Sequence, residues 1–168
     1  PLIAKYANQK NIAEIVKLTF TEEIMRAIDI TPSFIVGAQS YFARINNWKM
    51  FDFVVSRLTE IPESKKAVMS FIREEDYINV LKKPKNDYLP CITTIQFRLL
   101  KINNEKGYHM NIIFTARSID AYQKSIGNMV AIAMLGEEVA RRLRINLDAE
   151  VWTGSIDGII TDAHIYEN

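Results

Sequence analysis

Two apolar segments separated by a short polar turn constrain the fold of this chain more than any other feature of its sequence. The first segment is 91–101 and the second is 108–116, and both are rich in β-branched and aromatic residues. The residues between them, Asn103-Asn104-Glu105-Lys106-Gly107, end in glycine, as many hairpin turns do. The pattern predicts two antiparallel strands joined by a hairpin.

A packing partner for these strands is predicted directly downstream. Apolar residues between 120 and 144 recur at the i, i+3, i+4, i+7 spacing of an amphipathic helix. The predicted inner face of this helix consists of Met129, Ile132, Ala133, Gly136, Val139, Ala140 and Leu143. The helix is long enough to cover one face of a sheet.

Further elements are predicted on either side of these two. Helices are expected over 9–28 and 47–60, strands over 34–45, 66–73, 150–152 and 159–166, and a charged surface loop over 74–89. Together they predict an α+β fold with a mostly antiparallel or mixed β-sheet packed on one face by the long helix. At 168 residues the chain is expected to form a single domain, 1–168.

Composition excludes several classes of protein. The formal net charge is +1, which provides no field that would favour nucleic acid or a membrane surface. A single cysteine excludes an internal disulfide and a multi-thiolate metal site, and His109 and His164 are far apart in the sequence, so no metal is expected. No apolar run is long enough for a signal peptide or a membrane span. A free thiol favours the reducing cytoplasm.

The single cysteine, Cys91, is the first candidate for chemistry. A lone cysteine is most often a small buried apolar residue, so its neighbours must decide its role. A nucleophilic cysteine reacts as the thiolate, and a free thiol has a pKa near ~8.5 that nearby cations lower. Arg117 is expected to supply such a cation, because it follows the end of the predicted partner strand.

Arg117 and Ser118 precede the predicted long helix, and together they offer a fork of donors and a hydroxyl. A phosphate favours a bidentate arginine and a helix N-terminus, so this pair is a candidate phosphate site. The alternative is that Ser118 or Asp120 only caps the helix. Lys65 and Lys66 form a second cationic pair, for which plain solvation is the alternative.

Three further polar residues could contact a nucleotide. Asn128 lies in an apolar stretch, and its amide has both a donor and an acceptor for the edge of a uracil, although it could instead satisfy backbone groups. His164 and Tyr166 alternate on one face of a predicted strand. There they could hydrogen-bond a ribose hydroxyl or simply be surface residues.

In this order the motifs resemble those of the thymidylate synthase family, and the match runs in the same order over residues 35–168. The resemblance is greatest to the short archaeal-type branch of the family. The matching segments are Val36-Gly37-Ala38-Gln39-Ser40, Glu63-Ser64-Lys65-Lys66-Ala67-Val68, Pro90-Cys91 with Gln96-Phe97, Arg117-Ser118-x-Asp120, Gly127-Asn128, and Asp162-Ala163-His164-Ile165-Tyr166-x-Asn168. Single motifs of this kind are weak, but six in the same order are specific.

The resemblance implies a thymidylate synthase-like fold, a homodimer through the sheet, and attack of Cys91 on C6 of a pyrimidine nucleoside monophosphate, most simply dUMP. A one-carbon unit is then added at C5. The implied donor is a reduced pterin, either 5,10-methylenetetrahydrofolate or a methanopterin analogue. The resemblance implies that the phosphate is bound by Arg117 and Ser118, together with Lys65 and Lys66 of the other subunit. It implies that Asp120 and Asn128 contact the base. It implies that His164 and Tyr166 contact the sugar.

The sequence departs from the family at several of these positions. Ile92 follows the nucleophile where most members have histidine. Lys65 and Lys66 replace an arginine pair, which keeps the charge but loses the bidentate fork. No counterpart of the family's C-terminal segment, which closes over the folate, follows Asn168. Two other functions therefore stay open: a pyrimidine nucleotide 5-hydroxymethylase, and a catalytically altered homologue that only binds the nucleotide.

Overall fold

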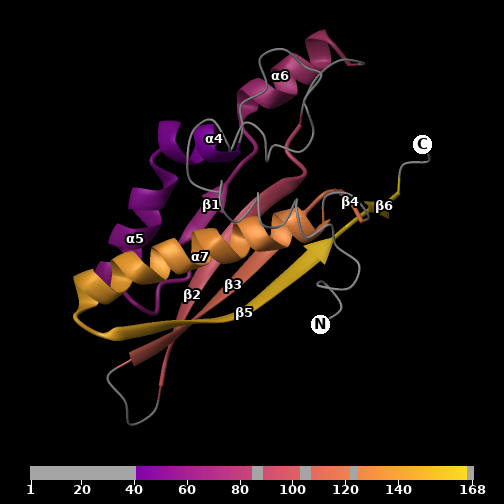
Figure 1. Cartoon of the computed structure of the whole chain (residues 1–168). Helices are drawn as coiled ribbons and strands as arrows, with labels where there is room; N and C mark the ends of the chain where they lie inside the picture. The colour runs from indigo at the N-terminus through magenta and orange to yellow at the C-terminus, as the bar shows by residue number, and fades with distance from the viewer. Residues whose placement is uncertain (1–40, 85–88, 103–106, 122–124, 166–168) are drawn as a thin grey trace.

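A computed structural model describes residues 41–84, 89–102, 107–121 and 125–165, which form an α+β fold of two layers (Figure 1). One layer is a four-stranded mixed sheet with the strand order β1-β2-β3-β5. Its strands are β1 (Val68–Ser70), β2 (Ile92–Lys101), β3 (Gly107–Ala116) and β5 (Glu150–Ile160). The other layer contains the helices α5 (Met50–Glu60) and α7 (Ser125–Leu147) on one face of the sheet. The predicted α+β class with a mixed sheet is therefore confirmed.

The predicted hairpin strands form the middle of the sheet. β2 and β3 pair antiparallel, with Phe97 opposite Ile112 and Leu99 opposite Met110. These four side chains are buried, whereas the residues between them on each strand are more exposed. β3 and β5 run parallel, and α7 lies between them in the chain. Residues 103–106 of the predicted turn lie outside the described residues.

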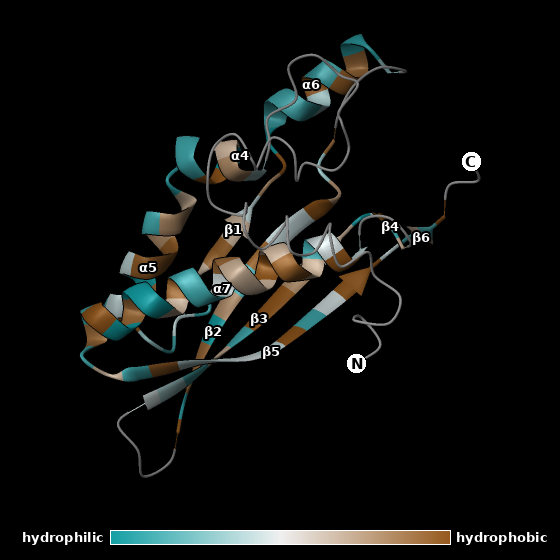
Figure 2. Cartoon of the chain, in the orientation of Figure 1, coloured by the Kyte–Doolittle hydropathy of each residue, from teal (hydrophilic) through white to brown (hydrophobic). Residues whose placement is uncertain are grey.

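Helix α7 packs its apolar side against the sheet, as predicted, although it spans Ser125–Leu147 rather than 120–144. Brown and teal residues alternate along it in Figure 2, as expected for an amphipathic helix. Its buried residues are Gly127, Ile132, Leu135, Gly136, Val139, Ala140 and Leu143. Ala133, which the spacing places on the inner face, is exposed, and the larger Leu135 is buried instead. In the described part of the chain, no helix combines the length and hydrophobicity needed to cross a bilayer.

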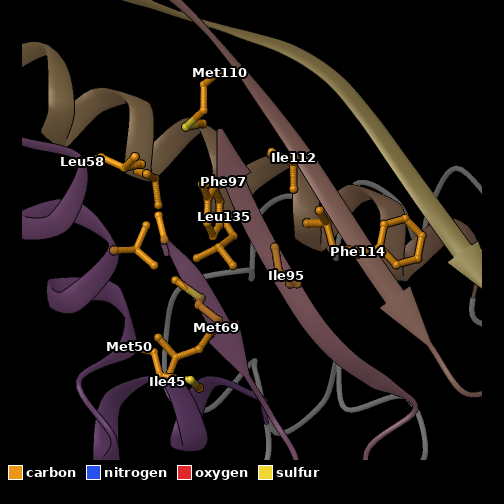
Figure 3. Packing of buried hydrophobic residues seen from close by; sticks show 14 of the residues in the cluster. Ile45, Met50, Leu58, Met69, Ile95, Phe97, Met110, Ile112, Phe114 and Leu135 are labelled. Carbon is orange, nitrogen blue, oxygen red and sulfur yellow. The ribbon is translucent and has the colours of Figure 1, made fainter. Parts of the chain in front are cut away.

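The core lies between these helices and one face of the sheet (Figure 3). Leu58 of α5, Met69 of β1, Phe97 of β2 and Val139 of α7 have no exposed surface. Burying a large apolar side chain contributes about 1.5–3 kcal/mol, so these positions hold the two layers together.

The strand predicted over 34–45 is wrong where the structure describes this region. Residues Tyr41–Asn47 form the helix α4. The aromatic and β-branched residues favour a strand by propensity alone. A helix, however, places Tyr41, Arg44 and Ile45 on one face at i, i+3 and i+4, where all three reach partners in other elements. Tertiary contacts therefore override the local preference.

Two other predictions for the first half hold in part. The helix predicted over 47–60 is present as α5, and its start follows Lys49, which has a left-handed φ of 51°. The strand predicted over 66–73 is reduced to the three residues of β1, which pair antiparallel with β2. The predicted helix 9–28 and residues 34–40 of the predicted strand lie outside the described residues.

Part of the surface loop predicted over 74–89 is a helix. α6 spans Glu74–Lys82 and projects away from the sheet (Figure 1). Its first turn carries three acidic residues, which favour a helix N-terminus. The Asp76 carboxylate also accepts a hydrogen bond from the backbone N–H of Arg73 at 2.8 Å, so it satisfies one of the donors at the helix start. Residues 85–88 of the predicted loop lie outside the described residues.

The strands predicted separately over 150–152 and 159–166 are joined in the structure. β5 runs without a break from Glu150 to Ile160, because it pairs with β3 along this whole length. A bulge absorbs the irregular middle of the strand: two residues of β5 oppose Asn111 of β3. The Asn111 Oδ1 atom accepts a hydrogen bond from the Ser155 N–H at 3.3 Å and stabilises the bulge.

Gly158 lets β5 lie against a buried aromatic ring. A Cβ atom at this position would overlap the ring of Phe114 on β3, which is only 3% exposed. Replacing Gly158 with valine is expected to lower the free energy of unfolding by about 1–3 kcal/mol, because the ring must shift within a close-packed layer. Urea unfolding followed by circular dichroism measures this loss.

The matched control for Gly158→Val is Ile159→Val, at the next position of the same strand. Ile159 is 67% exposed, so this change should alter the free energy of unfolding by less than about 0.5 kcal/mol. Equal losses in the two variants would contradict the packing argument.

Candidate functional site

Cys91 lies at the point where the chain enters β2. Leu89 and Pro90 precede it, and Ile92, which is buried, follows it as the first residue of the strand. Cys91 is a free thiol with a partly exposed side chain. Cys91 thus lies at the edge of the core and not within it.

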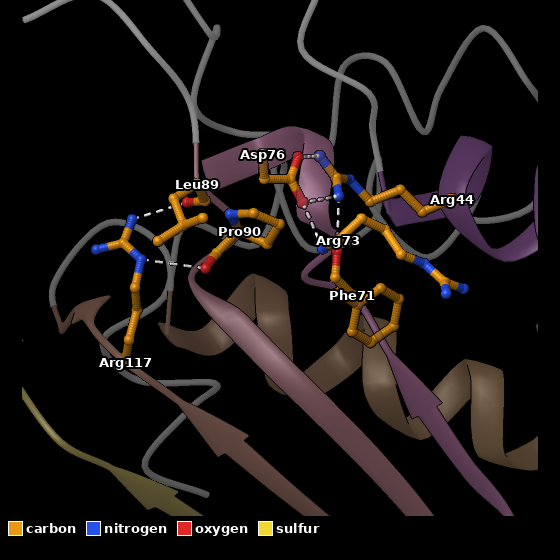
Figure 4. A network of polar contacts seen from close by, with 7 residues as sticks. All are labelled: Arg44, Phe71, Arg73, Asp76, Leu89, Pro90 and Arg117. Atoms are coloured by element: carbon orange, nitrogen blue, oxygen red, sulfur yellow. Dashed lines mark hydrogen bonds and ion pairs between the residues drawn. The ribbon is translucent and has the colours of Figure 1, made fainter. Parts of the chain in front are cut away.

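Arg117 directly follows β3 and lies across the hairpin from Cys91. Its backbone N–H donates to the Cys91 carbonyl at 2.9 Å. Its guanidinium donates from Nε to the Pro90 carbonyl at 3.1 Å and from Nη2 to the Leu89 carbonyl at 2.7 Å (Figure 4). One side chain thus holds the two residues before the thiol. The predicted position of Arg117 beside Cys91 is confirmed, whereas its role in phosphate binding stays a prediction.

Two donors approach the sulfur itself. Arg117 Nη2 and Ser118 Oγ each lie 3.9 Å from Cys91 Sγ. Arg117 Nη1 also donates to Ser118 Oγ at 3.1 Å, and Ser118 is buried, so the hydroxyl is held in place. The sulfur therefore lies within reach of two donors that the surrounding contacts hold in place.

Ser118 leads directly into a small parallel sheet formed by β4 (Ile119–Asp120) and β6 (Ala163–His164). Asp120 is 3% exposed and is the register partner of His164. Two backbone hydrogen bonds of 2.8 and 2.9 Å join this part of the chain to the C-terminal motif. The structure therefore brings Asp120 and His164 together, close in the chain to the Ser118 hydroxyl.

Asn128 lies in the first turn of α7, and its side chain is partly exposed. Because α7 begins shortly after β4, Asn128 is at the same end of the fold as Asp120. Its role in base recognition stays a prediction. Tyr166 and Asn168 lie outside the described residues.

Lys65 and Lys66 are not part of this cluster. Both are exposed and form a tight turn just before β1. The turn is attached to β2 through Gln96, whose Nε2 donates to the Lys65 carbonyl at 2.8 Å. Because a strand advances about 3.3 Å per residue, Gln96 lies on the order of 15 Å along the chain from Cys91. The lysine turn is therefore displaced along the sheet from the thiol.

A buried polar network that no sequence pattern indicates joins α4, α6 and the end of β1 (Figure 4). Arg44 forms a two-pronged ion pair with Asp76, with N–O distances of 2.6 and 2.7 Å, and donates to the Phe71 carbonyl at 2.6 Å. Burial acts to raise the pKa of Asp76, but hydrogen bonds from Arg44 and Arg73 and their positive charges outweigh it. The pKa of Asp76 is therefore held below its ordinary value.

Tyr41 lies near the thiol and, like the buried network, is not indicated by any sequence pattern. Its hydroxyl oxygen accepts a hydrogen bond from the Ile92 N–H at 2.8 Å, across a sequence separation of 51 residues. Its ring contacts Phe71 edge to face. No local signal could have found this contact, because it depends on how α4 packs beside β2.

The cluster of Cys91, Arg117 and Ser118 places a sulfur beside anion-stabilising donors at the partly exposed end of a sheet. Such an arrangement can support nucleophilic addition by sulfur to an electrophilic carbon of an anionic substrate. No protein-family model matches the chain, and no curated protein matches it either.

Proposed function

We propose that this protein is a thymidylate synthase-like enzyme that adds a one-carbon unit to C5 of a pyrimidine nucleoside monophosphate, with dUMP as substrate and dTMP as product. The observation that carries the proposal is the position of the Cys91 sulfur, 3.9 Å from donors of both Arg117 and Ser118. The collinear order of the motifs supports the same assignment. Thiols are kept reduced in the cytoplasm, and we therefore place the enzyme there.

Covalent catalysis by Cys91 would make C5 of the substrate reactive. The thiolate forms a bond to C6, and the π electrons of the C5–C6 double bond move to C5, where the C4 carbonyl stabilises them as an enolate. C5 can then take a proton from water. Loss of the original C5 hydrogen and expulsion of the thiolate return the nucleotide with that hydrogen exchanged. Covalent catalysis thus divides a difficult substitution at a vinylic carbon into easier steps.

We propose a reduced pterin as the carbon donor. Neither tryptophan of the chain, however, lies where it could stack on a pterin beside the thiol. Trp48 is covered by Arg73, whose guanidinium carbon lies 4.1 Å from the ring centroid, and Arg44 lies 5.2 Å from it. Trp152 lies beside His109, at the end of β3 that is far from Arg117. Exchange of the C5 hydrogen tests the role of Cys91 without the pterin.

The test is release of tritium from 5-tritiated dUMP, with and without methylenetetrahydrofolate. Release is the expected result, and it would establish attack at C6 and activation of C5. Product analysis then separates dTMP from hydroxymethyl-dUMP, and hydroxymethyl-dUMP as the product would replace methyl transfer with hydroxymethyl transfer. Absence of release from a protein whose Tm rises with dUMP would overturn the enzymatic proposal in favour of nucleotide binding alone.

A homodimer through the sheet belongs to the same proposal. The sheet face that points away from α5 and α7 carries Leu100, Trp152 and Ile159, which are 44%, 38% and 67% exposed. Leu100 and Trp152 flank His109 at one end of this face, and Ile159 lies toward the other end. Exposed apolar side chains on one face of a sheet can mark a protein–protein interface. Gln96, which holds the lysine turn, lies on this face as well. A second copy packed there would bring its lysine turn toward the site of the first.

Mixing two defective variants tests the shared site. Cys91→Ser and the double variant Lys65→Ala/Lys66→Ala are each expected to lose activity at low dUMP concentration. After the two proteins are unfolded and refolded together, random dimers should restore about a quarter of the wild-type sites, because half of the dimers carry one intact site. Tritium release measures the recovery.

The matched control for this experiment is Lys82→Ala/Lys83→Ala, a second exposed lysine pair, at the end of α6. This variant should keep wild-type activity on its own. No recovery in a mixture whose subunits have demonstrably exchanged would contradict the role of the lysine pair across the dimer.

A further inference from the structure

A side chain from a distant part of the chain holds the backbone immediately after Cys91. The Ile92 N–H donates to Tyr41 Oη at 2.8 Å. Ile92 is 4% exposed, and the register of β1 with β2 ends at the pair Ser70–Thr94, so β1 no longer accompanies β2 at this point. Tyr41 therefore provides the acceptor that a buried strand N–H requires after its neighbouring strand has ended.

Tyr41 is itself fixed in position. Its ring lies edge to face against Phe71, with ring centroids 5.0 Å apart and planes at 88°, and Phe71 is 1% exposed. The helix that carries Tyr41 is anchored by Arg44, which bonds the Phe71 carbonyl and the Asp76 carboxylate. A polar group supported by packing and by neighbouring hydrogen bonds is held within a narrow range of positions. The phenol oxygen is therefore a well-placed acceptor.

Cys91 is thus held from both sides along the chain. Arg117 donates hydrogen bonds to the carbonyls of Leu89 and Pro90, the two residues before Cys91. Tyr41 accepts a hydrogen bond from the N–H of Ile92, the residue after Cys91. The two contacts come from different elements, α4 and the end of β3, so together they set the position of the thiol relative to the rest of the fold.

We propose that Tyr41 is a positioning residue that acts through the Ile92 N–H to keep the Cys91 sulfur beside the donors of Arg117 and Ser118. The proposal rests on the proposed role of Cys91 as the nucleophile. Its physical basis is that displacing a reacting atom by about 1 Å can cost about 10²-fold in rate. The contact of Tyr41 with this part of the chain is to the Ile92 N–H, so its effect on the sulfur passes through the backbone.

The Tyr41→Phe variant removes the acceptor oxygen and keeps the ring against Phe71. The kcat of tritium release is expected to fall about tenfold or more, while the KM for dUMP stays within about twofold. The reason is that the change displaces the thiol and leaves the residues that contact the nucleotide in place. Tyr77→Phe is the matched control, because it removes the same atom from a tyrosine of α6 that is 56% exposed. Equal effects in the two variants, or a loss confined to KM, would overturn the proposal.

A second readout needs no substrate. Because Cys91 is the only cysteine, its alkylation by iodoacetamide reports on this thiol alone. Alkylation at fixed pH is expected to change by about threefold or more in Tyr41→Phe, because the displaced backbone presents the sulfur differently to the reagent. Tyr77→Phe should react as the wild type does. An alkylation rate unchanged by Tyr41→Phe would contradict the positioning role.

Amide hydrogen exchange tests the contact itself. In the wild type the Ile92 N–H should exchange slowly, and in Tyr41→Phe it should exchange at least about tenfold faster, because a buried donor has lost its acceptor. The N–H of Val54, in the core of α5, should be unaffected and shows that the fold is intact. Rapid exchange at Ile92 in the wild type would overturn the proposal without any variant.

The positioning role and the enzymatic function fail in different ways. If the wild type releases no tritium but alkylation and exchange respond to Tyr41→Phe, the assignment of dUMP as substrate fails and the role of Tyr41 stands. If the wild type releases tritium and Tyr41→Phe equals it in kcat and in alkylation, the role of Tyr41 fails and the enzymatic function stands.

Discussion

Replacing Cys91 with serine is expected to slow tritium release from dUMP by at least about 10³-fold, as the loss of a covalent nucleophile does in other enzymes. A hydroxyl is a much weaker nucleophile than a thiolate unless a base activates it. Arg117 and Ser118, which contact the sulfur, are donors and not bases, so neither would activate the new hydroxyl. Initial rates with 5-tritiated dUMP measure the loss.

Nucleotide binding separates a chemical defect from a structural one in this variant. Cys91→Ser should keep the rise in Tm that dUMP produces in the wild type, because the proposed phosphate, base and sugar contacts remain. Cys91→Ala should lose tritium release to the same extent. Release within tenfold of the wild-type rate in either variant would exclude the covalent mechanism.

Breaking the buried ion pair of Arg44 with Asp76 is expected to have the largest effect on stability. The two side chains are 5% and 9% exposed, so removing one partner leaves a buried charge without its counterpart. Arg44→Met or Asp76→Asn should therefore lower the free energy of unfolding by about 3–5 kcal/mol. Urea denaturation measures each loss.

An exposed pair provides the control for this prediction. Arg141 and Glu138 form a similar ion pair on α7 with an N–O distance of 2.6 Å, but their side chains are 50% and 32% exposed. Glu138→Gln should change the stability little, because solvent screens exposed charges. A loss in Asp76→Asn no larger than in Glu138→Gln would contradict the importance of the buried network.

The same pair predicts how stability depends on pH. The pKa of Asp76 is lowered in the folded state from its ordinary value of 3.8, so the folded protein holds this proton less tightly than the unfolded chain does. The contribution of Asp76 is therefore fully present above its unfolded pKa and is lost as the pH falls through the folded pKa. The difference in unfolding free energy between the wild type and Asp76→Asn should be constant near neutral pH and shrink below pH 3.8. A difference that grows on acidification would contradict the direction of this shift.

The position of Arg117 beside Cys91 was predictable because it follows from a hairpin. Ile92 pairs with Ala116 in the register of β2 and β3. Cys91, which precedes Ile92, and Arg117, which follows Ala116, must therefore be neighbours. Local alternation of apolar residues is enough to determine such a pair of strands. By contrast, nothing local linked Tyr41 to Ile92, because their contact depends on the packing of α4.

Two helices that local sequence does not predict have a common physical cause. Residues 41–45 look like a strand by composition, and 74–82 look like a loop by charge, yet both are helices. Arg44 and Asp76, one in each helix, stabilise both by pairing with each other in the interior. Secondary-structure propensities are too small to resist such contacts when a buried charge needs a partner.

The sequence by itself determined the α+β class, the hairpin of β2 and β3, the long helix α7 and the neighbourhood of Cys91 and Arg117. Each depends on periodicity or on pairing within a short stretch of chain. Only the tertiary structure decided that Tyr41 holds the backbone after the thiol and that the Lys65–Lys66 turn lies along the sheet from it. These contacts join residues distant in the chain, and they form because burying apolar surface brings separate elements together, after which buried polar groups must find partners.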